Sequence, residues 1–404
     1  MINIFYILFG LSFNYKISFF GDLYIAQIII IFLSIYSFFR WFGKNSLHDY
    51  EKITLFLVFL WLVNQIFSDM INKIDFIDYI RGNAKILVTF LSFYVFFKLS
   101  KLKNFSLIKM LFWILLVKIF FLLLDVNDYE TFLLNFKMGI GSAFSILIII
   151  MSYLYFYKEQ SELRGLALLG VVLMGFLSLA LEARSLFLHN LLFAGFLLLN
   201  NRFKIRNNFS LVLSTFLMAL VISTIYQFLI DSNFLPQSLV EKQEIQSGEL
   251  GILLGGRTEI ISSYKAILDA PLIGHGSWAK NCEYVDVKTD VLFRMGYLKK
   301  SIPSMSCLIP THSVIFGAWV TSGFFGFLTW FYLLFKIIKE TLAALKFKNN
   351  YYELALYLLV LCVWHIIFSP YGGTRMMMLP LYIATIFNIS SNYKNKISLK
   401  FLKV

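Results

Sequence analysis

Charged residues are scarce in this chain. They make up 15% of its 404 residues, whereas 59% are hydrophobic, and a soluble domain has about 25% charged residues. The composition therefore excludes an ordinary soluble protein and indicates an integral membrane protein. Segments of about ten residues with alternating hydrophobicity, which are typical of transmembrane β-barrels, are also missing. Apolar runs of roughly 16–25 residues recur instead, and they are long enough to cross a bilayer as helices.

Several catalytic motifs are absent as well. The polar segments lack Asp/Glu pairs at metal-ligand spacing, a Cys/His cluster, a P-loop and a G-x-S-x-G sequence. We therefore expect any chemistry to proceed without a metal ion or other cofactor. Positive side chains would then have to stabilise a leaving group such as phosphate.

The apolar runs predict an all-α polytopic membrane protein with about twelve transmembrane helices. The spans are expected near residues 2–13, 17–39, 53–68, 84–99, 105–124, 138–157, 163–181, 184–200, 209–230, 312–338, 351–369 and 374–390. One polar segment, about 231–311, separates the ninth span from the tenth, and it is too long for a simple connection. The chain thus divides into N-terminal helices (1–230), a large, partly helical loop (231–311) and C-terminal helices with a tail (312–404).

Basic residues predict the orientation of these helices. One set of loops is rich in Lys and Arg, whereas the opposite set carries Asp69, Asp75 and Asp78. By the positive-inside rule the basic set and both termini are cytoplasmic, and the large loop lies outside. The net charge of +13 is spread along the chain. It therefore indicates the orientation in the membrane and does not indicate a nucleic-acid-binding surface. Cys282 and Cys307 lie in the outer loop, where they either form a disulfide or stay free.

The stretch "GGRTEIISSYKAILDAPLIGHGSWAK", residues 255–280, interrupts the apolar pattern within this loop. Helical spacing of apolar residues, Tyr264 among them, predicts a short amphipathic helix over Thr258–Leu268 that lies along the membrane surface. Arg257 precedes the N-terminus of this helix, which favours an anion, and its planar fork suits phosphate oxygens. Alternatively, Arg257 reaches lipid headgroups or pairs with Glu259.

Two further segments place ionisable side chains at the outer ends of spans. Glu182 and Arg184, in "LEARSLFLHN", fall between two spans with almost no loop, and a charge near hydrocarbon is costly unless it is paired or functional. They either form a structural pair or present Arg184 to a charged lipid headgroup. His312, where the long loop re-enters the membrane, could accept a proton near neutral pH or serve only as an interfacial residue.

His275 and Arg375 are two further candidates. His275 lies between two glycines in "PLIGHG", where it could bind a substrate or shape the turn. Arg375, in "SPYGGTRMMM", lies at an outer helix end and is either a third phosphate ligand or an interfacial anchor.

Together these features resemble the bacterial O-antigen ligase and O-antigen polymerase superfamily, whose members have many spans and one large periplasmic loop. The family's arginine at the outer end of a span resembles Ala183-Arg184-Ser185. Its Gly-Arg before the loop helix and its Pro-x-x-Gly-x-Gly resemble Gly256-Arg257 and Pro271–Gly276. Its histidine at the end of the loop, followed by a glycine-rich span, resembles Thr311-His312. The histidine is followed by Ser where the family often has Asn, and Tyr264 stands near a position that is often Trp.

The resemblance implies an inverting glycosyltransferase of the bacterial inner membrane, without a metal or other cofactor. Its donor is a glycan on undecaprenyl pyrophosphate, presented at the periplasmic face. Arg184 and Arg257 would hold the pyrophosphate, and His312 would act as the base. The further substrate-binding residues are then expected to be Arg375, His275, Glu182, Lys265 and Tyr264.

Several functions stay open within this reading. An O-antigen polymerase, slightly favoured by the short Phe- and Ile-rich chain, joins lipid-linked repeat units, and a chain-length regulator protein is a further expected partner. A ligase transfers the glycan to lipid A core, and a protein-glycosylating relative is the third alternative. A glycan-lipid flippase is the alternative from another class, for which Lys109 and Lys118 within the fifth span are mild support.

Overall fold

The chain is a mostly helical membrane protein. The structure is a computed structural model that describes residues 2–18, 21–41, 47–156, 162–203, 208–232, 237, 259–294, 307–346 and 351–401. Its helices are α1 (Ile2–Ser12), α2 (Ile25–Trp41), α3 (Asp49–Ile71), α4 (Phe76–Ser100), α5 (Leu107–Leu124), α6 (Tyr129–Asn135), α7 (Gly141–Phe156), α8 (Glu162–Ala180), α9 (Arg184–Phe203), α10 (Asn208–Asp231), α13 (Glu259–Asp269), α14 (Cys282–Arg294), α15 (Val314–Ser322), α16 (Phe324–Lys346), α17 (Tyr352–Phe368) and α18 (Arg375–Phe401). A π-helical segment, η1 (Phe136–Ile140), joins α6 to α7.

Four helical segments in the described part of the chain are long and apolar enough to cross a membrane: α3, α4, α5 and the continuous run Tyr129–Tyr153. Shorter apolar helices account for six of the other expected spans, among them α1, α9 and α17. The number of twelve spans therefore stays a prediction. The predicted span at 17–39 begins later than expected, because Lys16–Ser18 (β1) and Asp22–Tyr24 (β2) form an antiparallel hairpin before α2.

Helix α17 lies at the centre of the bundle. Every residue from Tyr352 to Cys362 is buried, and α17 packs against α7, α9, α15, α16 and α18. A helix that is apolar on all sides is stable only when it is covered on all sides. Beside it, Trp61 of α3 and Trp330 of α16 are both fully buried and pack edge to face. The core is therefore formed jointly by helices from the two ends of the sequence.

The span predicted at 312–338 is wrong as a single helix. The chain breaks at Gly323, whose φ of 67° is in the left-handed region, so that α15 and α16 form a tight hairpin. Gly326 lies against the backbone of Ala318, where a Cβ would meet the carbonyl oxygen at 2.4 Å. Glycines at these two positions thus let the two helices approach closely.

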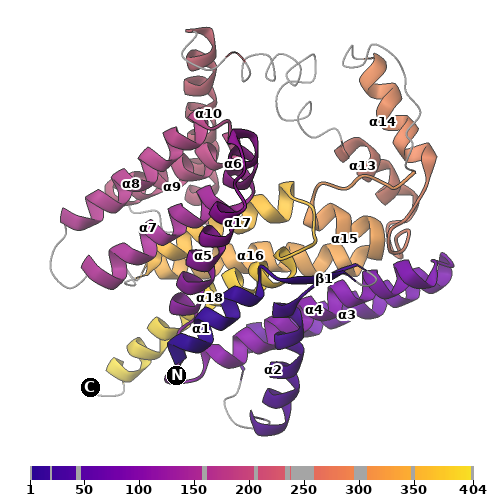
Figure 1. Cartoon of the computed structure of the whole chain (residues 1–404), viewed down its shortest axis with the longest axis horizontal. Coiled ribbons are helices and arrows are strands. Elements are labelled where there is room, and N and C mark those ends of the chain that lie inside the picture. The colour runs from indigo at the N-terminus through magenta and orange to yellow at the C-terminus, as the bar shows by residue number, and fades with distance from the viewer. Residues whose placement is uncertain are drawn as a thin grey trace.

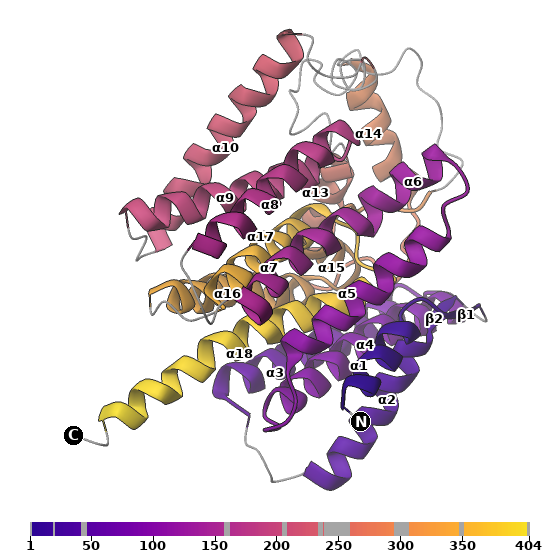
Figure 2. The same ribbon diagram turned by 60° about the vertical axis from the view of Figure 1, so that its left-hand side comes forward.

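One end of the bundle carries α13 and α14, and we call it the loop end. In Figures 1 and 2, α1 begins and α18 ends at the opposite side of the molecule. The expected amphipathic helix is present as α13, which buries Ser262, Ser263 and Ala266 and exposes Tyr264 and Leu268. Its small side chains permit close packing against α14. In this contact Ser262 Oγ donates to the backbone oxygen of Tyr284 at 2.7 Å.

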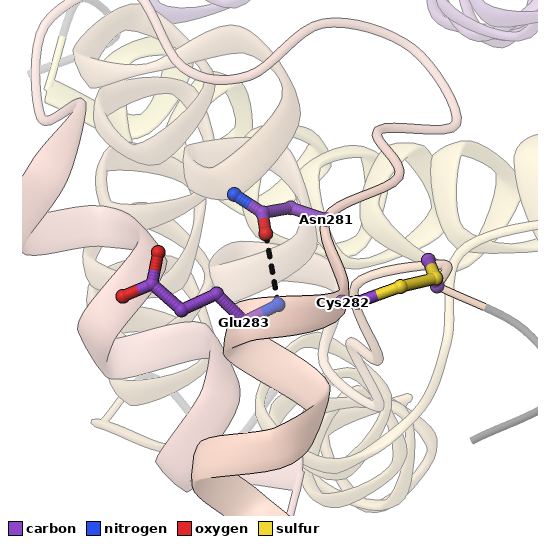
Figure 3. The surroundings of a disulfide bond; sticks show 4 residues. Asn281, Cys282 and Glu283 are labelled. Carbon is purple, nitrogen blue, oxygen red and sulfur yellow. Dashed lines mark hydrogen bonds between the residues drawn. A yellow bond between two sulfur atoms is a disulfide. The ribbon is translucent and has the colours of Figure 1, made fainter. Parts of the chain in front are cut away.

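The disulfide left open by the sequence is formed between Cys282 and Cys307 (Figure 3). Cys282 begins α14, and the N-terminus of that helix is capped by Asn281 Oδ1, which accepts from the backbone N–H of Glu283 at 2.9 Å. Next to the disulfide, Asn281 N donates to Cys307 O at 2.7 Å. The bond therefore fastens α14 to the strand-like segment that returns the chain to the bundle.

Replacement of both cysteines by serine is expected to lower the free energy of unfolding by about 3 kcal/mol, because the disulfide closes a loop whose ends are 25 residues apart. Denaturant titration of the detergent-solubilised protein measures this change. The Cys362→Ser variant is the control, because it removes the free buried thiol and leaves the disulfide in place. In this variant Cys282 should still resist alkylation. Equal stability of the wild type and the double variant would contradict the role assigned to the disulfide.

Candidate functional site

A polar face on α3 fixes the loop to the bundle. Its residues recur at helical spacing within an otherwise apolar helix: Trp61, Asn64, Gln65, Ser68, Asp69 and Asn72. Trp61 Nε1 donates to Ser322 Oγ at 2.8 Å, and Ser68 Oγ donates to Thr321 O at 2.9 Å. The end of α15 is therefore held against α3 by side-chain hydrogen bonds.

Asp69 is the centre of this network. It is 1% exposed, and its Oδ1 accepts from Ser277 N at 2.6 Å and from Gln65 Nε2 at 2.8 Å. Its Oδ2 accepts from Ser277 Oγ at 2.9 Å and from Asn83 Nδ2 at 2.8 Å. A buried carboxylate is tolerated only when its oxygens are satisfied in this way. Asp69 thus ties the turn that follows α13 to both α3 and α4.

Glycines make this contact possible. A Cβ at Gly82 would lie 1.8 Å from Ser277 Oγ, and a Cβ at Gly276 would lie 2.6 Å from the Ile74 side chain. Gly274 has a φ of +80°, and its missing side chain leaves room for the backbone of Thr321 and Gly323. The "PLIGHG" turn and the glycine break between α15 and α16 are therefore two halves of one interface.

His312 lies at the end of this anchored loop, immediately before α15. The hydroxyl of the next residue, Ser313, donates to Ile366 O of α17 at 3.2 Å. The Nδ1 atom of His312 is 3.8 Å from Oε1 of Glu259, the first residue of α13. The same carboxylate oxygen is 3.8 Å from Nζ of Lys288 on α14. His312 and Glu259 line a small hollow next to Phe368, so an imidazole and a carboxylate meet at the loop end of α17.

Arg184 begins α9 at the same end of the bundle. His189, five residues later, packs edge to face on Trp364 of α17 with ring centroids 4.8 Å apart. One turn further along α9, Phe193 packs edge to face on Tyr357 with ring centroids 5.2 Å apart, so α9 and α17 run antiparallel. Because α9 rises about 1.5 Å per residue, Arg184 lies about one and a half turns beyond His189, toward the end of α17.

Glu182, the acidic residue of the candidate Glu182–Arg184 pair, contacts a cation on another element. Its Oε2 is 3.5 Å from Nζ of Lys137 in η1, and its backbone has a φ of 58° in the tight turn between α8 and α9. Glu182 therefore has an ion-pair partner that the sequence did not predict, on a helix 45 residues earlier.

Arg375 begins α18 beside the end of α17. Its Nη1 donates to Pro370 O at 2.9 Å, and Nδ1 of His365 is 3.1 Å from Oγ of Ser369. The turn between them is held in the core by Tyr371, which hydrogen bonds to Thr89 and packs on Trp330 with centroids 5.2 Å apart. Arg184, His312 and Arg375 thus all lie at the loop end of α17.

The other candidates lie apart from this group or outside the described residues. His275 shapes the turn, since its ring Nε2 is 2.7 Å from Ala266 O and its backbone N–H donates to Val320 O at 2.7 Å. Lys265 is bonded to Glu283 at 2.5 Å, and this hydrogen bond raises the pKa of Lys265 above its usual value. Tyr264 points away from the packed side of α13 and is 63% exposed. Arg257 falls on residues that the structure does not describe.

Some relevant residues were missed at the sequence level. Asp69 was read only as a topology signal, and Lys137 was not singled out. The spacing of Asn64, Gln65 and Asp69 along one face of an apolar helix is a signal that predicts a polar contact with another segment. The partner of that contact, at residues 274–277, is about 200 residues away, and spacing within α3 cannot identify it.

The Asp69→Asn variant is expected to lower the free energy of unfolding by about 2–3 kcal/mol, because hydrogen bonds to a charged acceptor are lost and a new amide meets donors. Asp75→Asn is the matched control, since Asp75 is exposed and makes no capping bond. Denaturant titration gives the stability, and limited proteolysis between α13 and α14 reports release of the turn. Wild-type stability and proteolysis of Asp69→Asn would show that the network does not hold the loop.

Comparison of the chain with models of known protein families finds no match, and comparison with curated proteins finds none either. An assignment of function therefore depends on two things. One is the set of motifs that resemble the polymerase and ligase superfamily. The other is the geometry of the side chains that meet at the loop end of α17.

Proposed function

We propose that the chain is an O-antigen polymerase, an inverting glycosyltransferase that joins oligosaccharide repeat units carried on undecaprenyl pyrophosphate. The observation that carries the proposal is the meeting of His312 and Glu259 with Arg375 and the start of α9 at one end of α17. A basic imidazole and positive side chains at the same membrane level are what this reaction needs. One group removes a proton, and the others stabilise a departing diphosphate.

In the proposed reaction the acceptor hydroxyl oxygen attacks the anomeric carbon of the donor sugar. The bond between that carbon and the phosphate oxygen breaks on the opposite face, so the configuration inverts. The electron pair leaves with the diphosphate, where Arg184 and Arg257 would stabilise the developing charge. The hydroxyl proton passes to His312. Because Nδ1 faces Glu259, the opposite ring nitrogen, Nε2, is the one that accepts it.

Glu259 would assist this proton transfer. Its Oε1 lies 3.8 Å from Nδ1 of His312, so the carboxylate would keep the ring oriented with Nε2 toward the acceptor. Lys288 holds the same carboxylate oxygen from α14, so the orientation of Glu259 depends on the packing of α13 against α14. The disulfide and the Asp69 network would in this way support the base from a distance.

We further propose the orientation implied by the basic loops, with about twelve spans in the bacterial inner membrane. The loop end then faces the periplasm, and both termini face the cytoplasm. The exposed apolar side chains of α13, Tyr264 and Leu268, are suited to contact with the outer leaflet. A lipid-linked donor would thus reach the site from the membrane, and an acceptor would reach it from the membrane or from water.

The proposal is tested with purified protein and undecaprenyl-pyrophosphate repeat units, with and without lipid A core. A ladder of longer glycans on the polyprenyl carrier is the expected product. Transfer of a glycan to lipid A core would instead indicate the ligase reaction. Intact protein that gives neither product would contradict an enzymatic role and favour the flippase alternative.

Arg184→Ala, Arg257→Ala and His312→Ala are each expected to lower the rate of transfer at least about 100-fold, the usual loss when a charge-stabilising donor or a general base is removed. Arg294→Ala, at the exposed end of α14, is the matched arginine control and should retain wild-type activity. Glycan product is quantified by gel after the amounts of folded protein are equalised. Full activity in any of the three variants would remove that residue from the site.

A further inference from the structure

Trp278 combines a strained backbone with an exposed side chain. Its φ of 54° is in the left-handed region, which a bulky residue rarely adopts, and the residue is 47% exposed. Two other positions of the same turn have φ values of +80° and +86°, and both are glycines, Gly274 and Gly276, for which this conformation has no steric cost. Tryptophan therefore occupies a position where glycine would fit more easily. Strain of this kind, at an exposed residue, indicates a functional role.

The backbone on both sides of Trp278 is fixed. Ser277 donates two hydrogen bonds to the buried Asp69 carboxylate, one from its N–H at 2.6 Å and one from its hydroxyl at 2.9 Å. On the other side, Ala279 O accepts from Ile309 N at 3.0 Å. Within the described part of the chain, the indole between these two anchors makes no hydrogen bond and no aromatic ring contact. The fold therefore holds the indole at the surface, where its exposed part is available to a ligand.

Helix α4 lies directly beside this position. Gly82 of α4 faces Ser277, whose Oγ would be 1.8 Å from a Cβ at Gly82. Asp78, one turn earlier on the same face of α4, has its Oδ2 at 3.6 Å from Nζ of Lys280. The segment from Ser277 to Lys280 therefore runs along one face of α4, and Trp278 lies within it.

The polar groups next to Trp278 can bind a ligand. The contact between Asp78 and Lys280, at 3.6 Å, is an ion pair that is too long for a hydrogen bond. The Lys280 side chain is 63% exposed, so its ammonium group can donate to a ligand and the Asp78 carboxylate can accept from one. Arg81 is a second cation beside this carboxylate, with its Nη1 at 3.6 Å from Oδ1. An exposed aromatic ring thus has acceptor and donor groups close to it.

This combination suits a sugar. The C–H groups on one face of a sugar ring pack on the apolar face of an indole, and the sugar hydroxyls both donate and accept hydrogen bonds. Ligand sites commonly combine an aromatic surface with a few polar groups that fix the orientation of the ligand. An acyl chain would instead cover charged side chains without pairing them, and the Asp78 carboxylate would repel a phosphate.

A short extended segment connects this surface to His312. Lys280 pairs with Leu308 in an antiparallel bridge, and Leu308 is four residues before His312. Pro310 lies in this segment, and its carbonyl oxygen accepts from Ser263 Oγ of α13 at 3.1 Å. Because an extended chain spans about 3.3 Å per residue, His312 lies at most roughly 13 Å from Leu308. A glycan that is bound beside Lys280 can therefore extend to His312.

We propose that Trp278, Asp78 and Lys280 form a saccharide-binding platform for the acceptor glycan. This inference rests on the proposed function and identifies where the acceptor is held. One sugar ring stacks on the indole, and its hydroxyls donate to the Asp78 carboxylate and accept from the Lys280 ammonium. This sugar is a neighbour of the reacting sugar in the acceptor, whose hydroxyl lies at His312. The platform thus determines which acceptor is bound and takes no part in the proton transfer.

The test is a calorimetric binding measurement with the full-length protein in phosphatidylcholine nanodiscs. The probe is the water-soluble oligosaccharide released by mild acid from the glycan of the bacterium that produces the protein, so it carries neither the lipid nor the diphosphate. Wild-type protein should bind the probe, and Trp278→Leu should weaken binding about 10-fold, because the stacking contact is lost. Trp278→Phe retains an aromatic face and should stay within about 3-fold of the wild type. Phe293→Leu is the matched control, since Phe293 on α14 is 49% exposed, and it should bind as the wild type does.

Trp278→Gly separates binding from folding. Glycine adopts a positive φ freely, so this variant should resist denaturant at least as well as the wild type and should still bind about 10-fold more weakly. Lys280→Met should weaken binding about 3-fold, the effect of one lost hydrogen bond. Wild-type affinity in the folded Trp278→Leu and Trp278→Gly variants would overturn the proposal, and so would wild-type protein that has no measurable affinity for the probe.

The alternative occupant of this surface is membrane lipid, and fluorescence distinguishes the two. The difference between the emission of the wild type and that of Trp278→Phe reports the surroundings of the indole. Acrylamide in the water should quench this difference signal, and the oligosaccharide should protect it. Quenching by phosphatidylcholine with brominated acyl chains would place the indole in the bilayer and would overturn the saccharide site in favour of a lipid contact.

The two proposals fail in different ways. If wild-type protein binds the probe through Trp278 but makes no glycan product, the platform stands and the glycosyltransferase proposal fails. If the wild type makes product while Trp278→Leu changes neither the affinity for the probe nor the KM for the acceptor, the platform fails and the enzymatic proposal stands.

Discussion

The buried carboxylate of Asp69 is the contact on which the rest of the arrangement depends. It accepts two hydrogen bonds from Ser277 and one each from Gln65 and Asn83, so two transmembrane helices and the loop share one charged acceptor. Because a buried carboxylate is stable only with its donors in place, the loop is not free to leave the bundle. The position of α13, and with it Glu259, follows from this constraint.

The loop end separates two chemical environments along α17. Near its last turn, His312 and Glu259 line a hollow on the loop side. One turn deeper, Nδ1 of His365 lies 3.1 Å from Oγ of Ser369, and the Arg375 guanidinium donates to the adjacent Pro370 O. A lipid-linked glycan has the same division, with a water-soluble sugar next to a charged diphosphate and an apolar chain. The proposed site therefore matches this type of molecule in the order of its parts, from loop to bilayer.

Local features of this protein could be predicted from the sequence, whereas contacts over long distances could not. Helical spacing after Arg257 predicted α13 to within one residue at each end, and the helix end at Arg184 was expected from two abutting apolar runs. The break at Gly323 was missed, because only its contact with Leu272 explains why a glycine is needed there. For the same reason Asp69 could not be grouped with Ser277 and Asn83, nor Glu182 with Lys137, because these partners are distant in the sequence.

The most direct test of the account is an experimental structure of the protein with an uncleavable undecaprenyl-diphosphate sugar bound, determined by cryo-electron microscopy. The account predicts diphosphate density between Arg184 and Arg375 at the loop end of α17, with the sugar within reach of His312. Density for the diphosphate at the opposite end of the bundle, or on a face remote from α17, would contradict it.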